Sequence, residues 1–250
     1  MKKTNILAVL LLMVAGVQQT WAQKVVLHKT DGDVLEYNVS KLDSMVVLGR
    51  YDTDNKEWVD LGLPSGTLWA TCNIGASSPE EYGDYFAWGE TEPKEDYIWS
   101  TYKYCLYPAS VFTKYNMDDS FGDIDNKTEL DPEDDAATAN WGNDWQMPSA
   151  EQFDELIDER YTITTWVNKN GSYGRLITSK AGGRSIFLPA AGYRYSTDRT
   201  YAGTDGYYWS RSLMPSYTNR AYHLTFDLSQ LGKADLSRYA GCNVRPVRKK

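Results

Sequence analysis

The stretch Trp145-Gln146-Met147-Pro148-Ser149-Ala150-Glu151-Gln152-Phe153 predicts the clearest helix in this chain of 250 residues. Ser149 is a preferred N-cap residue, and Gln152 follows three residues later, where its side chain reaches back to the backbone N–H of the cap. Phe153 and Leu156 begin an apolar stripe at helical spacing. The pattern predicts a short amphipathic helix that begins directly after Ser149.

The residues that follow this helix predict strands and turns. Turn signals occur at Asn170-Gly171, Gly182-Gly183 and Asp205-Gly206. The candidate strands are Ile163 to Val167, Arg175 to Thr178, Ser185 to Pro189, Tyr207 to Ser212, Ala221 to Phe226 and Cys242 to Val247. We expect His223 to be a surface residue of its alternating strand.

Towards the N-terminus, Trp58 to Gly66 predicts a strand and a tight turn, and Leu68 to Gly75 predicts a second strand. The segment Ser78-Pro79-Glu80-Glu81 has the pattern of a helix start, with a cap, a proline and a glutamate in the favoured positions. Gly83 follows almost at once, so this helix is expected to be brief. Two short helices among many strands predict an α+β domain with a loop-rich antiparallel sheet.

The first 22 residues have the pattern of a cleavable secretory signal. A positive start precedes the apolar run Ile6 to Val17, and small residues flank Trp21 before Gln23. That run is shorter than the ~20 residues that span a bilayer, so we expect no membrane span and an exported protein in the periplasm, on the cell surface or outside the cell. After the signal, residues 23–50 predict a small β unit, with a hairpin turn at Asp31-Gly32 and a further strand at residues 45–48. Residues 51–56 predict a linker, and residues 57–250 the main domain.

Charge and residue counts exclude several kinds of site. The formal net charge is −8, which disfavours nucleic acid as a partner because phosphates need a basic patch. The locally basic tail from Arg245 to Lys250 is expected to be a solvated terminus. The two histidines and the three cysteines, Cys72, Cys105 and Cys242, lack zinc-binding spacing, and one pairing, Cys72 with Cys242, stays open.

Seven ordered blocks resemble the Fibrobacter succinogenes major paralogous domain, a family of exported bacterial proteins. The blocks are Trp58 to Ala70, Tyr82 to Thr91, Asp131 to Ala137, Trp145 to Ser149, Ile186 to Arg194, Gly206 to Ser210 and Val244 to Val247. The resemblance implies a C-type-lectin-like fold, related to the fold of formylglycine-generating enzymes. In that wider group an arginine is usual where Gln146 stands here.

The resemblance brings no catalytic activity with it. Oxidases of the formylglycine-generating type need reactive cysteines close together, whereas Cys242 has no cysteine neighbour in the sequence. No catalytic residue is predicted, and an enzyme is the third-ranked hypothesis.

A crowded acidic loop predicts a possible calcium site, because calcium takes six to eight oxygen ligands. The candidate ligands are Asp123, Asp125, Asp131, Glu133, Asp134 and Asp135. The spacing is not that of an EF-hand, and a solvated acidic loop is the preferred alternative.

Tyrosines among small polar residues predict a recognition surface in the C-terminal half. The candidate ligand-binding residues are Tyr193, Tyr195, Arg199, Tyr201, Tyr217 and Arg220. The favoured hypothesis is a non-catalytic binding domain for a glycan or a surface protein. The main alternative is a structural or adhesive subunit that docks onto an assembly through residues 23–50.

Overall fold

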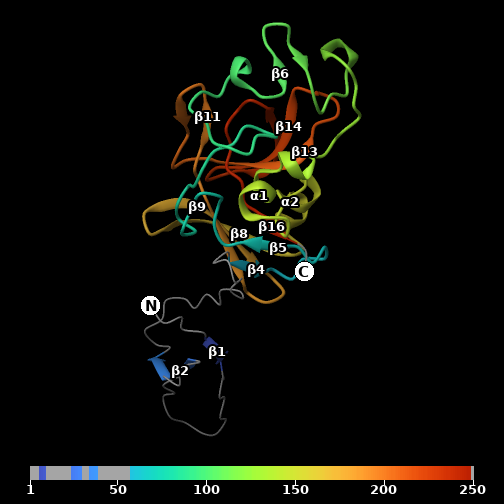
Figure 1. Ribbon diagram of the computed structural model, residues 1–250. Coiled ribbons are helices and arrows are strands. Elements are labelled where there is room, and N and C mark those ends of the chain that lie inside the picture. The colour runs from blue at the N-terminus through green and yellow to red at the C-terminus, as the bar shows by residue number, and fades with distance from the viewer. Residues whose placement is uncertain (1–5, 10–23, 30–33, 39–56, 249–250) are drawn as a thin grey trace. The chain divides into compact units, whose positions relative to one another are not determined.

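The computed structural model describes residues 6–9, 24–29, 34–38 and 57–248, and the chain divides into two units, Met1–Val47 and Leu48–Lys250 (Figure 1). In the first unit, β1 (Ile6–Val9), β2 (Lys24–Lys29) and β3 (Val34–Asn38) pair antiparallel in that order. The β2–β3 pairing confirms the hairpin predicted for this unit. The predicted strand at residues 45–48, the cleavage site and the linker lie outside the described residues.

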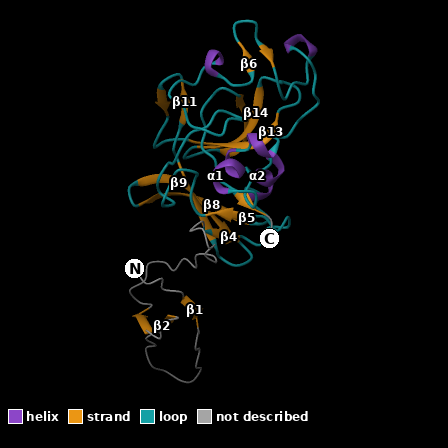
Figure 2. Cartoon of the chain, in the orientation of Figure 1, coloured by secondary structure: helices purple, strands orange, loops and turns teal. Residues whose placement is uncertain are grey.

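The second unit consists mostly of antiparallel strands, with two short α-helices (Figure 2). This confirms the α+β class. The strands are β4 (Trp58–Asp60), β5 (Leu68–Ala70), β6 (Cys105–Leu106), β7 (Val111–Phe112), β8 (Thr162–Lys169), β9 (Ser172–Ser179), β10 (Ser185–Pro189), β11 (Tyr193–Tyr195), β12 (Asp198–Thr200), β13 (Gly206–Leu213), β14 (Arg220–Phe226), β15 (Leu231–Ser237) and β16 (Val247–Arg248). The helices are α1 (Ala136–Trp141) and α2 (Ala150–Leu156), with 3-10 turns at Trp99–Thr101, Asp119–Phe121 and Pro132–Asp134.

Five small sheets make up this unit. Their strand orders are β16-β5-β4, β10-β9-β8, β13-β14-β15, β11-β12 and β6-β7. The strand pair β6–β7 and the hairpin β11–β12 lie toward one end of the unit, whereas β4 and β5 lie toward the other (Figure 1). The first end is built mainly from loops (Figure 2).

Helix α2 forms where the capping pattern predicts it. The Ser149 hydroxyl accepts from the Gln152 backbone N–H at 3.2 Å, and the Gln152 side chain accepts from the Ser149 N–H at 2.8 Å. Phe153 and Leu156 are fully buried, so the apolar stripe of α2 faces the core. The predicted boundary and the predicted buried face are both confirmed.

The helix predicted at Ser78 is wrong. The segment is a turn, and the Glu81 carboxylate accepts from the backbone and hydroxyl of Ser77 rather than closing a helical cap. Gly83 follows in a left-handed conformation with φ +71°, which stops any helix there. The other short α-helix is α1 instead. In its first turn, the backbone N–H groups of Ala137 and Thr138 donate to the Asp135 carboxylate, which caps the helix.

Strands differ from the prediction at the C-terminal end. The turn at Asn170-Gly171 connects β8 and β9 as predicted, with φ values of +51° and +93°. Strand β15 was not predicted; it pairs along its whole length with β14. Of the strand predicted from Cys242 to Val247, Cys242 and Asn243 form isolated bridges, residues 244–246 form none, and only Val247 joins a sheet, through β16.

Two clusters of buried side chains form the core of the second unit. One gathers around Trp88, Trp145 and Trp209, and the other around Trp69 and Phe153. Within the described part of the chain, no helix has the length and apolar character needed to cross a membrane.

Candidate functional site

Three of the four predicted ligand-binding tyrosines, Tyr193, Tyr195 and Tyr201, lie at the β11–β12 hairpin. Tyr193 faces Thr200 across the hairpin, and Arg194 faces Arg199. Because side chains alternate along a strand, the two arginines share one face and Tyr193 and Tyr195 share the other. The hairpin therefore separates Arg199 from the tyrosines with which it was predicted to act.

The tyrosine face continues into an aromatic surface made of Trp99, Tyr193, Tyr195, Tyr201 and Tyr239. Neighbouring ring centroids lie 4.7 Å apart for Trp99 and Tyr239, 6.0 Å for Tyr239 and Tyr195, and 6.1 Å for Tyr193 and Tyr201. Tyr195 is 51% exposed and Tyr201 56%, whereas the other three rings are half-buried. The surface thus combines anchored rings with two that are open to a partner.

Tyr217 and Arg220 do not join this surface. Tyr217 is exposed in the connection between β13 and β14. Arg220 forms an ion pair with Asp235 on β15, and its guanidinium also donates to the Asp235 carbonyl oxygen at 3.0 Å. No contact found among the described residues connects either side chain with the β11–β12 hairpin.

Arg199 reaches a different neighbourhood, next to Tyr82 and Tyr85. Its guanidinium carbon lies 5.4 Å from the centroid of the Tyr82 ring. Burial raises the pKa of Tyr85 to about 12, although Arg199 opposes that rise. Tyr85 is therefore protonated at neutral pH, and its hydroxyl donates to the Ala191 carbonyl at 2.6 Å.

An open hollow of about 610 Å³ lies beside Tyr82, and we refer to it as the Tyr82 hollow. Its lining residues are Ser78, Glu80, Glu81, Tyr82, Asn170 and Ser172. They come from the turn that was predicted to be a helix and from the β8–β9 turn. None of these positions was predicted as a site, because the two segments lie about 90 residues apart and only the fold brings them together.

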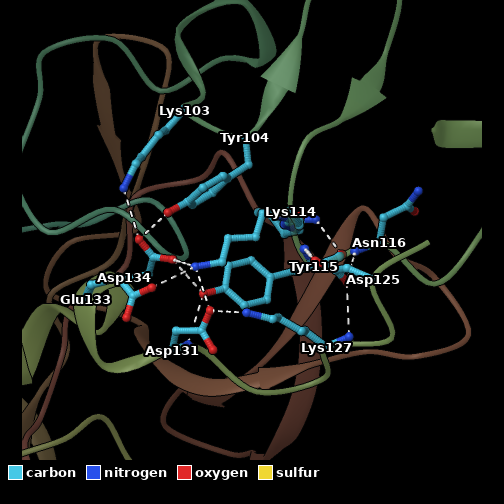
Figure 3. A network of polar contacts seen from close by, with 11 residues as sticks. Lys103, Tyr104, Lys114, Tyr115, Asn116, Asp125, Lys127, Asp131, Glu133 and Asp134 are labelled. Atoms are coloured by element: carbon cyan, nitrogen blue, oxygen red, sulfur yellow. Dashed lines mark hydrogen bonds and ion pairs between the residues drawn. The ribbon is translucent and has the colours of Figure 1, made fainter. Parts of the chain in front are cut away.

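The acidic loop is neutralised by lysines (Figure 3). The structure brings Asp131, Glu133 and Asp134 together, with one carboxylate oxygen from each within 4.8 Å of the others. The Lys114 ammonium lies among them, 2.6 Å from Asp131 and Asp134 and 3.2 Å from Glu133 (Figure 3). Lys127 also binds Asp131, at 2.5 Å. The Lys114 ammonium therefore lies among three of the carboxylates that were predicted to bind calcium.

The same contacts hold Asp134 ionised. Burial by itself would raise the pKa of Asp134, but hydrogen bonds from Lys114, Tyr104 and Tyr115 outweigh it and lower the pKa. Conversely, burial would lower the pKa of Lys114, and its bonds to Asp131 and Asp134 raise it. The cluster is thus centred on the Lys114–Asp134 ion pair, which accepts further hydrogen bonds from the hydroxyls of Tyr104 and Tyr115.

The other predicted calcium ligands lie apart from this cluster. Asp125 accepts from the backbone N–H groups of Tyr115 and Asn116, at 2.6 and 2.9 Å, and so stabilises a loop turn. Asp135 is buried, caps α1 and accepts from the Met147 N–H. Asp123 is exposed. The six predicted ligands therefore do not form one site.

Of the nucleophile and base candidates, Cys105, Cys242 and His223 are buried, and Cys72 is half-buried. All three cysteines are free thiols, so Cys72 and Cys242 do not pair in this structure. Burial raises the pKa of the Cys242 thiol well above its ordinary value. The prediction that His223 is a surface residue is wrong, because it is 3% exposed under Tyr207 and burial lowers its pKa to about 4.

In comparisons with protein-family models, with curated proteins and with solved structures, nothing matches this chain. The resemblance to the Fibrobacter succinogenes family therefore rests on the sequence blocks alone.

Proposed function

We propose that this protein is an exported, non-catalytic binding domain that recognises a glycan or a surface protein through the aromatic surface. The observation that carries the proposal is the exposure of Tyr195 and Tyr201 beside half-buried rings. Tyrosine offers a rigid contact area with a polar tip at low entropic cost, which suits recognition.

The sequence blocks support the remainder of the proposal. A chain with this signal-like start and these blocks would belong to the Fibrobacter succinogenes major paralogous domain family and would have a C-type-lectin-like fold. The α+β class and the loop-rich end of the second unit are compatible with such a fold. The proposal assigns no catalytic residue, since Cys242 and His223 are both buried.

The test is to probe the labelled chain on a glycan array and in a pull-down against bacterial surface proteins. Tyr195→Ala and Tyr201→Ala should each weaken the strongest signal about tenfold, as expected for anchor residues at a binding surface. Tyr173→Ala is the matched control, because Tyr173 is 47% exposed on β9 and belongs to a separate ring pair with Trp166.

Melting temperatures should stay within about 2 °C of the wild type for all three variants, because exposed side chains contribute little to stability. A binding signal that survives both Tyr195→Ala and Tyr201→Ala, or that is lost in Tyr173→Ala, would refute the aromatic surface as the binding site.

A further inference from the structure

We propose that the Tyr82 hollow is a second binding site, which takes an uncharged saccharide. It goes beyond the function proposed above, because it uses other residues and the opposite face of the β11–β12 hairpin. The hollow is open to solvent over much of its volume of about 610 Å³, so it suits a ligand that keeps one side in water, as a sugar ring can.

The walls of the hollow are held in place by buried groups. The Tyr82 carbonyl accepts from the side-chain amides of Asn73 and Asn243, both at 2.8 Å, and both asparagines are fully buried. Arg199 lies against the Tyr82 ring from the hairpin side. A site built on fixed groups loses little entropy when a ligand binds.

An ion pair and hydrogen bonds connect the two walls of the hollow, which are the Glu80–Tyr82 segment and the β8–β9 turn. The Glu80 carboxylate binds the Lys169 ammonium at 2.9 Å and the Asn170 side-chain amide at 3.1 Å. The Ser172 hydroxyl donates to the Glu80 carbonyl at 2.9 Å. These contacts connect the β8–β9 turn with the Glu80–Tyr82 segment and define the width of the hollow.

The chemistry of the lining matches a sugar. Carboxylates accept hydrogen bonds, an amide and serine hydroxyls both donate and accept, and sugar hydroxyls can meet each of these groups. The Tyr82 ring offers an apolar face for the C–H side of a pyranose ring.

The charge of the lining selects against anionic ligands. Among the six lining residues the charged side chains are the carboxylates of Glu80 and Glu81, and Lys169 already neutralises Glu80. Glu81 is exposed and is held by Ser77. Arg199, which lies against the Tyr82 ring, balances the second carboxylate, so an acidic sugar would bring an uncompensated charge to the hollow, whereas a neutral hexose would not.

The experiment titrates the full chain with glucose, galactose, mannose and glucuronate and follows binding by saturation-transfer NMR. Ligand-efficiency limits predict a Kd of about 1–10 mM for the preferred hexose. Glucuronate should bind at least about tenfold more weakly. Asn170→Gly and Glu80→Gln should each weaken hexose binding about fivefold or more, because the first removes a hydrogen-bonding amide and the second removes the carboxylate charge that holds Lys169.

Two controls make the result specific. Asn170 has a positive φ of +51°, so glycine fits its backbone without strain, and Asn126→Gly makes the same change at φ +57° in an exposed loop. Asn126→Gly should leave hexose binding unchanged, and Tyr195→Ala reports any part of the signal that arises at the aromatic surface.

Absence of saturable hexose binding, or binding that survives both Asn170→Gly and Glu80→Gln, would overturn the proposal. Glucuronate binding as tight as hexose binding would overturn the neutral class. Loss in Tyr195→Ala with retention in Asn170→Gly would move the sugar to the aromatic surface, which contradicts this inference and supports the function proposed above.

Discussion

The ammonium of Lys114 lies 2.6 Å from the Asp134 carboxylate, inside the acidic loop where the sequence predicts calcium (Figure 3). The Tyr115 hydroxyl donates to the same carboxylate oxygen at 2.6 Å, and the Tyr104 hydroxyl donates to the other oxygen. Both oxygens of the Asp134 carboxylate thus accept from donors of the chain, and the Lys114–Asp134 pair organises the loop.

Calcium should not stabilise the protein. Lys114 neutralises Asp131 and Asp134, so calcium should find no free site among these carboxylates. Weak extracellular calcium sites have dissociation constants of up to about 1 mM, so we expect the melting temperature in ~5 mM calcium to lie within about 1 °C of that in EDTA. Differential scanning fluorimetry checks this. Lys114→Met is the informative variant, since it removes the cation and leaves the carboxylates to repel one another. A calcium-dependent rise in the wild type would contradict this interpretation.

Acid should destabilise the protein partly through Asp134. Its pKa is lowered in the folded state, so its stabilising contribution is present above the unfolded value of about 4 and is lost as the pH falls from there through the folded pKa. The limiting slope for one proton is about 1.4 kcal/mol per pH unit. Urea unfolding at pH 4.5, 3.5 and 2.5 measures it.

Asp134→Asn tests that assignment. The variant should be less stable than the wild type at pH 7 and should show a smaller loss between pH 4.5 and pH 2.5. Asp144→Asn is the control, because Asp144 has a side chain that is 76% exposed. Equal slopes in Asp134→Asn and the wild type would rule out Asp134 as the source.

His223 should make the protein less stable between pH 7.5 and pH 5. Burial lowers its folded pKa to about 4, below the unfolded value of about 6.5, so in that interval the unfolded chain binds more protons. Stability therefore falls as the pH falls, by about 2 kcal/mol between pH 7.5 and pH 5. His223→Phe should remove this part of the difference, as measured by urea unfolding at the two pH values.

The ring of His223 stacks on Tyr207 with an interplanar angle of 16°, so phenylalanine retains the packing. Phenylalanine also removes an Nδ1 atom that has no hydrogen-bond partner in the structure. At pH 7.5 the variant should be as stable as the wild type within about 1.5 kcal/mol, the range of volume-conserving swaps. A variant with the same pH dependence as the wild type would show that another group titrates.

Arg238 should be among the most costly side chains to replace. It is fully buried, and its guanidinium donates to the carbonyls of Lys114, Tyr115 and Thr218 over 3.0–3.1 Å. Arg238→Met removes the donor to the Lys114 and Thr218 carbonyls and one of the two donors to the Tyr115 carbonyl, and we expect it to lower the free energy of unfolding by about 3 kcal/mol or more. Arg238→Lys should recover only part of this lost free energy of unfolding, since an ammonium cannot reproduce the planar, forked arrangement of donors of a guanidinium.

Denaturant unfolding of these variants checks the prediction, with Arg160→Met as the control. The side chain of Arg160 is 75% exposed, and its loss should change the free energy of unfolding by about 0.5 kcal/mol or less. A similar small effect for Arg238→Met would contradict the assignment.

Local signals predicted the elements whose hydrogen bonds are themselves local. The cap of α2 lies within four residues, and the positive-φ turn between β8 and β9 uses Asn170-Gly171, so both are visible in the sequence. Strand β15 has no such signal. Its sequence, LGKADLS, is weakly β-forming, and it is a strand because β14 offers a paired edge.

Partners distant in the sequence account for the errors at single residues. Arg245 was expected in a solvated tail, but it is fully buried and donates to Asn73 and to the Phe187 carbonyl. Trp99 and Tyr239, which extend the aromatic surface, come from segments 140 residues apart. Neither spacing nor composition can indicate such contacts.

The sequence by itself determined the α+β class, the position of α2, the β8–β9 hairpin and the abundance of tyrosine in the C-terminal half, because these depend on composition, short-range periodicity, caps and turns. Only the tertiary structure decided which side chains act together. It placed Lys114 among the acids, separated Arg199 from Tyr195, and brought Glu80 and Asn170 to one hollow. The physical reason is that charge neutralisation, burial and the choice of strand face depend on neighbours that the folded chain alone supplies.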